Sequence, residues 1–367
     1  MIYRSKAPLR IGLAGGGTDV SPYSDLYGGA ILNATVSLYA HATIEPLNED
    51  TIILQGLDRG EEQRFEGGAA HDSHSAHGPV HAPLPIDGKL DLLKGVYNRI
   101  LKEYGGGTGA PGTTGSAGTG FPKGFRLSTF VDAPAGSGLG TSSTLVVAII
   151  GAFAEMLRLP LGEYDMAHLA YDIERVDLRM AGGRQDQYAA TFGGVNYMEF
   201  YGEDKVIVNP LRVKQQYLFE LENNLLLYYT STSRESAKII EKQSQNVVDK
   251  KEKSIEAMHQ LKHQAQLMKE ALLKGRIHEI GEILDFGFRQ KQQMAEGISN
   301  PLIDDMYDKA RKAGATGGKI SGAGGGGFMT FYCPGISKYR VMEALSDFGG
   351  YCKPYQFTDH GLTSWTI

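Results

Sequence analysis

Hydrophobic and polar positions alternate along this chain in patterns that predict a mixture of strands and helices. Short runs rich in apolar and β-branched residues predict strands, and most of them end at turn-forming residues. These runs cover residues 3–13, 30–44, 51–57, 62–65, 125–132, 195–200, 205–208, 225–230 and 328–332. Apolar residues three and four apart predict helices. The predicted helices cover residues 91–103, 141–157, 161–178, 278–296 and 301–313.

The second half of the chain has a different character. Residues 234–274 are highly charged and predict one long helix, because apolar residues recur on one side of it. This apolar stripe consists of Ile255, Met258, Leu261, Ala265, Met268 and Leu272. A length of 367 residues also suggests two compact domains. The sequence therefore predicts a boundary near residue 210, with domains at 1–209 and 210–367.

Composition and charge are those of an ordinary globular protein. Hydrophobic residues make up 41% of the chain and charged residues 22%. The net charge of -5, with no obviously basic face, argues against nucleic acid as the main partner. The two cysteines form no disulfide framework, no secretory segment follows Met1, and the longest apolar run, residues 145–154, is too short to span a bilayer. We therefore expect a cytoplasmic protein with no membrane partner.

Two stretches are predicted to be insertions. Residues 67–85 carry four histidines, and residues 105–120 consist mainly of glycine, threonine, serine and alanine. The histidine spacing could suit a metal ion, but no cysteine and only Asp72 lies nearby as a further ligand. A solvated loop is the preferred interpretation.

The 48 glycines exceed the roughly 7% typical of proteins, and many of them gather in three loops. The central loop, residues 132–143, joins a predicted strand to an apolar helix. Backbone amides in such a loop can approach a ligand, and the helix that follows offers unpaired N–H groups and a positive dipole end. The loop therefore favours a phosphate cradle, in which Thr141, Ser142 and Ser143 add hydroxyl groups. A tight turn with a serine cap is the alternative.

The first loop, residues 8–19, and the third, residues 319–327, are also glycine-rich and adjoin predicted strands. Either could be a simple turn, but three such loops are hard to explain as turns alone. The central loop lacks the lysine of a P-loop, and Thr141 stands where a dinucleotide fingerprint needs its last glycine. Residues 322–327 have that fingerprint's glycine spacing, but a strand follows them instead of a helix. An NAD-dependent oxidoreductase is therefore disfavoured.

In their order, the three loops resemble the motifs of the galactokinase, homoserine kinase, mevalonate kinase and phosphomevalonate kinase (GHMP) superfamily. The resemblance covers nearly the whole chain, and residues 134–143 are its most specific element, with Thr141 where serine is common. It implies an α+β fold with an α/β N-terminal domain, a ferredoxin-like C-terminal domain and the active site between them. It also implies a kinase that uses ATP and Mg²⁺. The implied nucleotide-binding residues are Pro134, Gly136, Ser137, Gly138, Leu139, Gly140, Thr141, Ser142 and Ser143.

Within this superfamily, residues 10–19 and the following Ser21, Pro22 and Tyr23 look like sugar kinases that phosphorylate the anomeric oxygen. Residues 183–188 support that group. The similarity is closest to D-glycero-D-manno-heptose 7-phosphate kinases, with the fucokinase branch next. It implies transfer of the γ-phosphate of ATP to the anomeric hydroxyl of that sugar, giving a 1,7-bisphosphate for nucleotide-activated heptose and surface glycans.

The resemblance gives the catalytic roles to Asp186 and Arg10. Asp186 matches the carboxylate that would accept the proton of the sugar hydroxyl as it attacks the γ-phosphorus. Its alternative role is to cap the turn at residues 182–183. Arg10 matches a cation that would stabilise developing negative charge and keep Asp186 ionised. The alternative for Arg10 is a surface position on an edge strand.

The implied magnesium ligands are Ser143 and Glu174. Magnesium takes few protein oxygens and fills its shell with phosphates and water. Glu174 lies at the edge of the apolar stripe of the predicted helix 161–178, so it could point into a cleft. Alternatively, Glu174 is a solvated residue paired with Arg175 or Arg179.

The implied contacts to the sugar lie in all three loops and beyond them. They are Gly16, Gly17, Thr18, Asp19, Tyr23, Arg184, Ser321, Gly322, Gly324 and Gly325. The phosphate of the sugar needs a basic receptor, because an unpaired dianion in a cleft is costly. Arg184 is the leading candidate, followed by Arg179, Lys6 and Arg4, and each could equally be an ordinary surface charge.

The expected partners are a small sugar phosphate and ATP. The sequence does not decide whether the protein forms a homodimer. A fucokinase-like enzyme, or another 1-kinase for a neutral sugar, is the competing enzyme. A sugar-binding relative without catalysis is the competing function of another class. The intact set of Arg10, Ser143, Glu174 and Asp186 argues against that relative.

Overall fold

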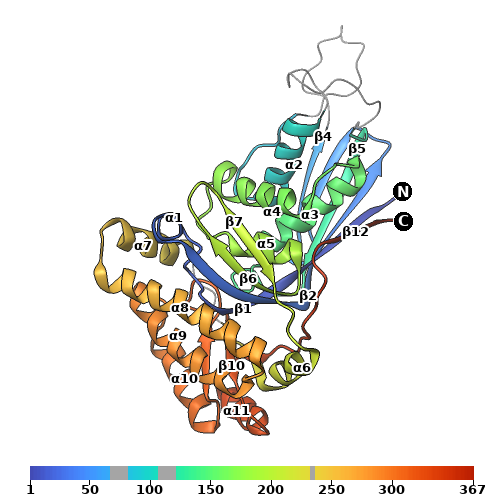
Figure 1. The fold of residues 1–367 in the computed structure, drawn as a ribbon. Helices are drawn as coiled ribbons and strands as arrows, with labels where there is room; N and C mark the ends of the chain where they lie inside the picture. The colour runs from blue at the N-terminus through green and yellow to red at the C-terminus, as the bar shows by residue number, and fades with distance from the viewer. Residues whose placement is uncertain (67–81, 106–120, 232–235) are drawn as a thin grey trace.

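The computed structural model describes residues 1–66, 82–105, 121–231 and 236–367. Most of both predicted insertions, 67–85 and 105–120, therefore lies outside the described residues. The chain forms two sheets with helices packed against them, which confirms the predicted α+β class (Figure 1).

The first half is built on an eight-stranded sheet, in which the order β12-β1-β2-β5-β3-β4 is extended by β6 on β2 and β7 on β6. Its strands are β1 (Tyr3–Ala14), β2 (Gly29–Leu47), β3 (Thr51–Gly56), β4 (Glu61–Glu66), β5 (Gly124–Val131), β6 (Val195–Phe200), β7 (Val206–Pro210) and β12 (Thr363–Thr366). All pairs are antiparallel except β3 with β5. A parallel pair needs a crossover, and the chain between β3 and β5 supplies it.

Helices cover this sheet around the central α3. They are α1 (Tyr23–Tyr27), α2 (Asp91–Tyr104), α3 (Thr141–Leu157), α4 (Glu163–Asp172) and α5 (Gln185–Phe192). The residues of α3 are apolar on every side and almost all buried, which is typical of a helix enclosed by other elements. It packs on β1 and β2, and α2, α4 and α5 pack around it (Figure 1). This burial fixes the start of α3, and with it the central glycine loop.

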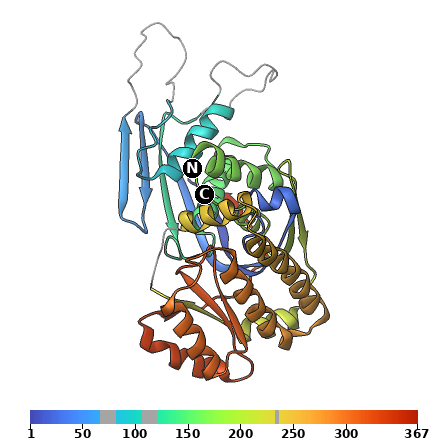
Figure 2. The same ribbon diagram turned by 90° about the vertical axis from the view of Figure 1, so that its left-hand side faces the viewer.

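The second half has a four-stranded antiparallel sheet in the order β11-β8-β10-β9. Its strands are β8 (Leu225–Tyr229), β9 (Gly317–Ile320), β10 (Phe328–Tyr332) and β11 (Tyr351–Cys352). Its helices are α6 (Gln215–Asn224), α7 (Ser236–Val248), α8 (Glu252–Lys274), α9 (Ile280–Met294), α10 (Pro301–Ala313) and α11 (Ser337–Leu345), with short 3₁₀ turns η2 (Ile277–Glu279) and η3 (Ser346–Phe348). Figure 2 shows this half, in orange and red, below the large sheet.

Two helix predictions differ from the structure. The predicted helix 234–274 is two helices, α7 and α8, because the chain turns at Lys250, which has a left-handed φ of 52°. The predicted helix 161–178 is α4 followed by a π-helical turn, η1 (Ile173–Asp177). Such π turns are frequent at functional sites, and this one carries Glu174.

The last strand returns to the first half of the molecule. β12 pairs with β1 in antiparallel register, from Tyr3 opposite Thr366 to Lys6 opposite Thr363. The two chain ends therefore lie side by side (Figure 1). The predicted domain boundary at 209/210 falls at the end of β7 and remains a prediction. The chain after β11 leaves the second half and ends in the first, where β12 pairs with β1.

The two halves also share apolar contacts through α8. Its residues Ala265, Met268, Ala271 and Leu272 are buried in the same cluster as the large sheet. This packing brings the loop between β9 and β10 close to the loop before α3. Among the described residues, no helix is both long enough and apolar enough to cross a membrane.

Candidate active site

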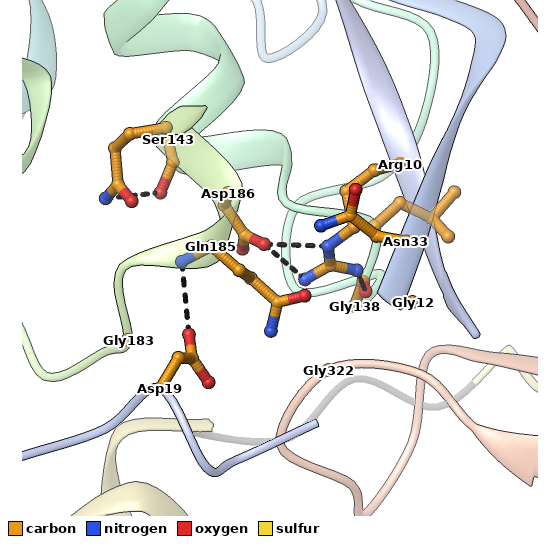
Figure 3. A network of polar contacts seen from close by, with 12 residues as sticks. Arg10, Gly12, Asp19, Asn33, Gly138, Ser143, Gly183, Gln185, Asp186 and Gly322 are labelled. Atoms are coloured by element: carbon orange, nitrogen blue, oxygen red, sulfur yellow. Dashed lines mark hydrogen bonds and ion pairs between the residues drawn. The ribbon is translucent and has the colours of Figure 1, made fainter. Parts of the chain in front are cut away.

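The first glycine loop joins β1 to α1 and is fixed by its own polar side chains. The Thr18 hydroxyl donates to the carbonyls of Gly15 and Ala30, at 2.8 and 3.0 Å. The Asp19 carboxylate, only 2% exposed, accepts from the backbone N–H groups of Arg184 and Gln185, at 2.9 and 3.1 Å. Asp19 therefore binds the start of α5, as Figure 3 shows. Burial, and then the charge of Asp186, raise the pKa of Asp19.

The contact between Asp19 and the start of α5 requires a glycine at position 183, because there is no space for a side chain. A Cβ atom at this position would lie 1.9 Å from Oδ2 of Asp19. The glycine pair at 182–183, which the sequence suggests as a turn, therefore lets a carboxylate from a distant loop reach the start of α5.

Arg10 and Asp186 form a close ion pair at the centre of the site (Figure 3). Nε and Nη2 of Arg10 lie 2.7 and 2.6 Å from Oδ1 of Asp186, and Nη1 donates to the Gly138 carbonyl at 2.5 Å. The Arg10 side chain is 4% exposed and that of Asp186 is 22% exposed. Both contacts use Oδ1, and Oδ2 has no hydrogen-bond partner among the described residues. Asp186 thus keeps one oxygen available to a ligand.

The central loop presents the start of α3 next to this pair. Gly136, Gly138 and Gly140 have φ values of 71°, 81° and 80°, and no side chain caps the helix. A Cβ at Gly140 would lie 3.0 Å from Cγ of Asp186. The N–H groups of the first turn of α3 and its positive dipole end therefore remain available to a phosphate.

Glu174 and Ser143 lie together in a buried cluster. Glu174, 0% exposed, accepts from the Ser142 hydroxyl at 2.9 Å and from Nε2 of Gln187. The same nitrogen donates to Oγ of Ser143 at 3.1 Å. A carboxylate only accepts hydrogen bonds, so the amide nitrogen of Gln187 must face it. Gln187, also 0% exposed, thus joins the two predicted magnesium ligands.

The third loop packs directly against the central loop. A Cβ at Gly322 would lie 2.8 Å from Cα of Gly138, and Phe328 N–H donates to the Ser137 carbonyl at 2.9 Å. The buried hydroxyl of Ser321 has no hydrogen-bond partner among the described residues.

Two cavities of about 420 Å³ meet at the central loop. Both are lined by Gly136, Thr141, Ser142 and Met180. The first has a largely apolar wall, formed by Ile86, Leu90, Leu92, Leu93, Leu145 and Leu178. The second contains the predicted chemical groups, namely Arg10, Asp19, Ser143, Glu174 and Asp186, together with Lys291. An elongated ligand could therefore lie across the start of α3, with its apolar end in the first cavity.

Some predicted site residues do not reach the second cavity. Tyr23 is buried, and its hydroxyl lies 2.8 Å from Nδ1 of His259. The Arg184 guanidinium pairs with Asp25 at 2.8 Å and Asp204 at 3.2 Å. The structure thus places Arg184 in a local ion-pair cluster instead of in the cleft lining.

Other predicted contacts shape the loops without lining either cavity. Gly325 N–H donates to the Ile298 carbonyl at 2.8 Å, and Leu139 is fully buried in the core. The remaining predicted residues outside both linings are Pro134, Ser137, Gly16, Thr18, Ser321 and Gly324. Of the proposed phosphate receptors, only Arg179 lines the cleft.

The sequence prediction missed three features: Gln187, Lys291 and the apolar cavity. Gln187 directly follows Asp186, so its place beside the proposed catalytic residue was a usable signal. Lys291 gave no signal, because it occupies an ordinary position in a charged helix. The apolar residues of the first cavity could not be told apart from core residues by pattern alone.

Comparison with known proteins places this geometry in context. The model for the GHMP kinases N terminal domain matches residues 91–194, and the model for the GHMP kinases C terminal domain matches residues 268–349. A Campylobacter jejuni protein named D-glycero-alpha-D-manno-heptose 7-phosphate kinase is 45% identical over 364 residues, covering 99% of each chain. The Bacteroides fragilis L-fucokinase/L-fucose-1-P guanylyltransferase is 27% identical over 88% of this chain and 34% of its own.

Solved structures show the same similarity. A D-glycero-D-manno-heptose 1-phosphate kinase from Bacteroides thetaiotaomicron superposes with a TM-score of 0.79 at 44% identity, covering 100% of this chain and 99% of its own. A mevalonate kinase, at 17% identity and a TM-score of 0.70, covers 98% of this chain and 100% of its own and shares the fold.

Proposed function

The chain belongs to the GHMP kinase family and is a sugar kinase, and from this premise we propose that it transfers the γ-phosphate of ATP to the anomeric hydroxyl of D-glycero-D-manno-heptose 7-phosphate. The product is the 1,7-bisphosphate. The names of the two heptose kinase relatives differ in the position of the sugar phosphate, 7 in one and 1 in the other. The proposal takes the 7-phosphate as the acceptor, because the first loop resembles that of anomeric kinases.

The observation that carries this proposal is the Arg10–Asp186 pair beside the uncapped start of α3. A kinase must bring an acceptor oxygen, a base and the γ-phosphate together, and it needs little covalent chemistry of its own. The proposed base, cation and phosphate cradle come from α5, β1 and the loop before α3 respectively, and their residues line one cavity.

In the proposed reaction, the nucleotide base lies in the apolar cavity and the phosphates lie over the start of α3. Oδ2 of Asp186 accepts the proton of the anomeric hydroxyl as that oxygen forms its bond to the γ-phosphorus. The bond from the γ-phosphorus to the bridging oxygen breaks, and ADP leaves. Arg10 holds Asp186 through Oδ1, which orients the carboxylate, and stabilises the negative charge on the transferred group.

Ser143 and Glu174 fit a magnesium site. Their oxygens, with that of Ser142, form a hard donor set in the cleft wall, and such a set suits Mg²⁺. Among the described residues, no cluster of three histidine, cysteine or acidic side chains competes with it. When bound, Mg²⁺ would neutralise charge on the ATP phosphates. Glu174 and Ser143 would hold it, and Gln187 would orient both.

The test is a coupled ADP-release assay with a panel of acceptors. The panel contains heptose 7-phosphate, the free heptose, heptose 1-phosphate, fucose, mannose and galactose. We expect turnover to require the 7-phosphate, and ³¹P NMR to show a new anomeric phosphate. Preference for free fucose would instead favour a fucokinase-like enzyme, and sugar binding without any ADP release would favour a non-catalytic relative.

A further inference from the structure

Lys291 is a buried cation in the second cavity that the proposed reaction does not use. It lies on α9, in the second half of the molecule, and is 4% exposed. Its Nζ donates to the Gly322 carbonyl and lies 3.6 Å from where a Cβ of Gly16 would be. It therefore sits between the first and third loops, in the lining that also contains Asp19 and Asp186.

The carboxylates near Lys291 are already engaged. Asp186 is paired with Arg10, and Asp19 is held by the backbone N–H groups at the start of α5. Lys291 makes no ion pair with any residue that the structure describes. A second buried lysine, Lys319, donates to the Gly12 carbonyl at 2.7 Å, and burial, then the charge of Lys291, lower its pKa. Burial, and then the charge of Arg10, lower the pKa of Lys291 to about 8.

Another buried lysine in this protein shows what a structural lysine looks like. Lys94, 0% exposed, is held by Asp87 and lies 3.7 Å from Asp91. Two carboxylates thus offset the cost of burying that charge. Lys291 has one carbonyl in their place, and no carboxylate among the described residues lies within ion-pair distance of it, although Asp19 acts on it at longer range. A buried charge of this kind is costly unless an anion pairs with it.

We propose that Lys291 receives a phosphate group in the acceptor half of the cleft. The inference rests on the proposed function, and it assigns to Lys291 the role for which Arg184 was the leading candidate in the sequence analysis. That guanidinium is committed to Asp25 and Asp204. The phosphate can come from two sources, namely the acceptor sugar's own phosphate or the phosphoryl group during transfer. Both are phosphate oxyanions, which an ammonium binds through charge-assisted hydrogen bonds.

The experiment compares Lys291→Met, which keeps an unbranched side chain one atom shorter and removes the charge, with Lys291→Arg, which keeps the charge. Lys312→Met on α10 is the matched control, because Lys312 is exposed and lines neither cavity. Calorimetry with heptose 7-phosphate and with the free heptose measures binding, and steady-state kinetics gives kcat and KM. We expect Lys291→Met to lose about 30-fold in affinity or rate, with Lys291→Arg retaining most of it and Lys312→Met unchanged.

The kinetic pattern identifies the source of the phosphate. A higher KM and Kd for heptose 7-phosphate, with binding of free heptose unchanged, assigns Lys291 to the acceptor phosphate. A lower kcat with unchanged Kd assigns it to the transferred phosphoryl group. Unchanged binding and kcat in Lys291→Met would overturn the proposal.

Two further measurements separate this inference from the proposed function and from a structural role. Inorganic phosphate should raise the melting temperature of the wild type and Lys312→Met by more than that of Lys291→Met, which keeps only the cradle at the start of α3, even if no heptose is ever phosphorylated. Unliganded Lys291→Met should melt no lower than the wild type, because it loses a buried charge. Equal stabilisation of all variants by phosphate, or a lower melting temperature in Lys291→Met, would contradict a phosphate receptor.

Discussion

At the scale of single residues, the carboxylates of Asp186 and Glu174 differ in how their oxygens are hydrogen-bonded. Oδ1 of Asp186 is held by Arg10, and Oδ2 faces the cavity side near Gly140. The two oxygens of Glu174 accept from neutral donors, Ser142 and Gln187, and Nη2 of Arg175 lies 3.8 Å from Oε2. This difference supports the proposed roles, in which Asp186 takes a proton and Glu174 holds a cation.

Asp186→Asn should lower kcat by about 10³-fold, because the amide cannot accept the proton of the attacking hydroxyl. Its size is unchanged, so the affinity for ATP, measured by calorimetry, should stay within about twofold of the wild type. Asp305→Asn, an exposed change on α10, is the control. Turnover near the wild-type level in Asp186→Asn would remove this carboxylate from the reaction.

Gln187→Leu should weaken metal binding by about 10-fold, because it leaves Glu174 and Ser143 without their shared donor. Glu174→Gln should weaken it further by removing the charge. Titration of turnover with Mg²⁺, and of the ADP complex with Mn²⁺ followed by electron paramagnetic resonance, measure this directly. Gln293→Leu, exposed on α9, is the comparison. Identical metal titrations in Gln187→Leu and the wild type would make Gln187 a packing residue only.

At the scale of elements, the sequence predicted what a local pattern determines. The limits of α3 agree with the predicted helix 141–157, because its apolar residues and the glycine loop before it are both local signals. The break between α7 and α8 was missed, because the left-handed residue is a lysine, which carries no such signal. The short helix α5 was missed too. Its start is held by a hydrogen bond from the Arg184 N–H to Asp19, and these two residues are 165 positions apart in the sequence.

Gly183→Ala tests this contact between distant elements. A methyl group there would lie 1.9 Å from Asp19 Oδ2, so the carboxylate must leave the start of α5. We expect a loss of roughly 1–3 kcal/mol in unfolding free energy, measured with urea, and a large loss of sugar binding. Gly202→Ala should change neither, since its nearest neighbour is 3.5 Å away. Equal stability in Gly183→Ala would show that Asp19 has room to move.

At the scale of the whole molecule, the site is assembled from both halves of the chain. Arg10, Asp186 and Lys291 come from β1, α5 and α9, and Gly322 lies against Gly138 from the opposite half. Sequence motifs identified the glycine loops and the charged residues within them. They could not identify Lys291, because only the packing of α9 beside the first loop gives that residue its surroundings. The return of β12 to β1 is likewise a consequence of the complete fold.

The burial of Lys291 also predicts how stability depends on pH. Its pKa is lowered from 10.5 to about 8 in the folded protein, where Arg10 from β1, Asp19 from the first loop and Lys319 from β9 surround it. Between these values the unfolded chain binds a proton that the folded chain does not, so the contribution of Lys291 to stability rises with pH across this window. Below pH 8 both states are protonated, and the full cost of burial is present.

Lys291→Met should therefore be more stable than the wild type near pH 7, and this advantage should shrink as the pH rises from about 8 toward 10.5. Urea unfolding of the two proteins across this range measures the difference, and Lys312→Met corrects for lysine loss in general. Groups that lie away from Lys291 titrate alike in both proteins and cancel, whereas the pKa of Lys319 should be less depressed in Lys291→Met, because burial and then the charge of Lys291 lower it in the wild type. A difference that stays constant with pH would mean that Lys291 keeps an ordinary pKa, and that its charge is offset without a bound phosphate.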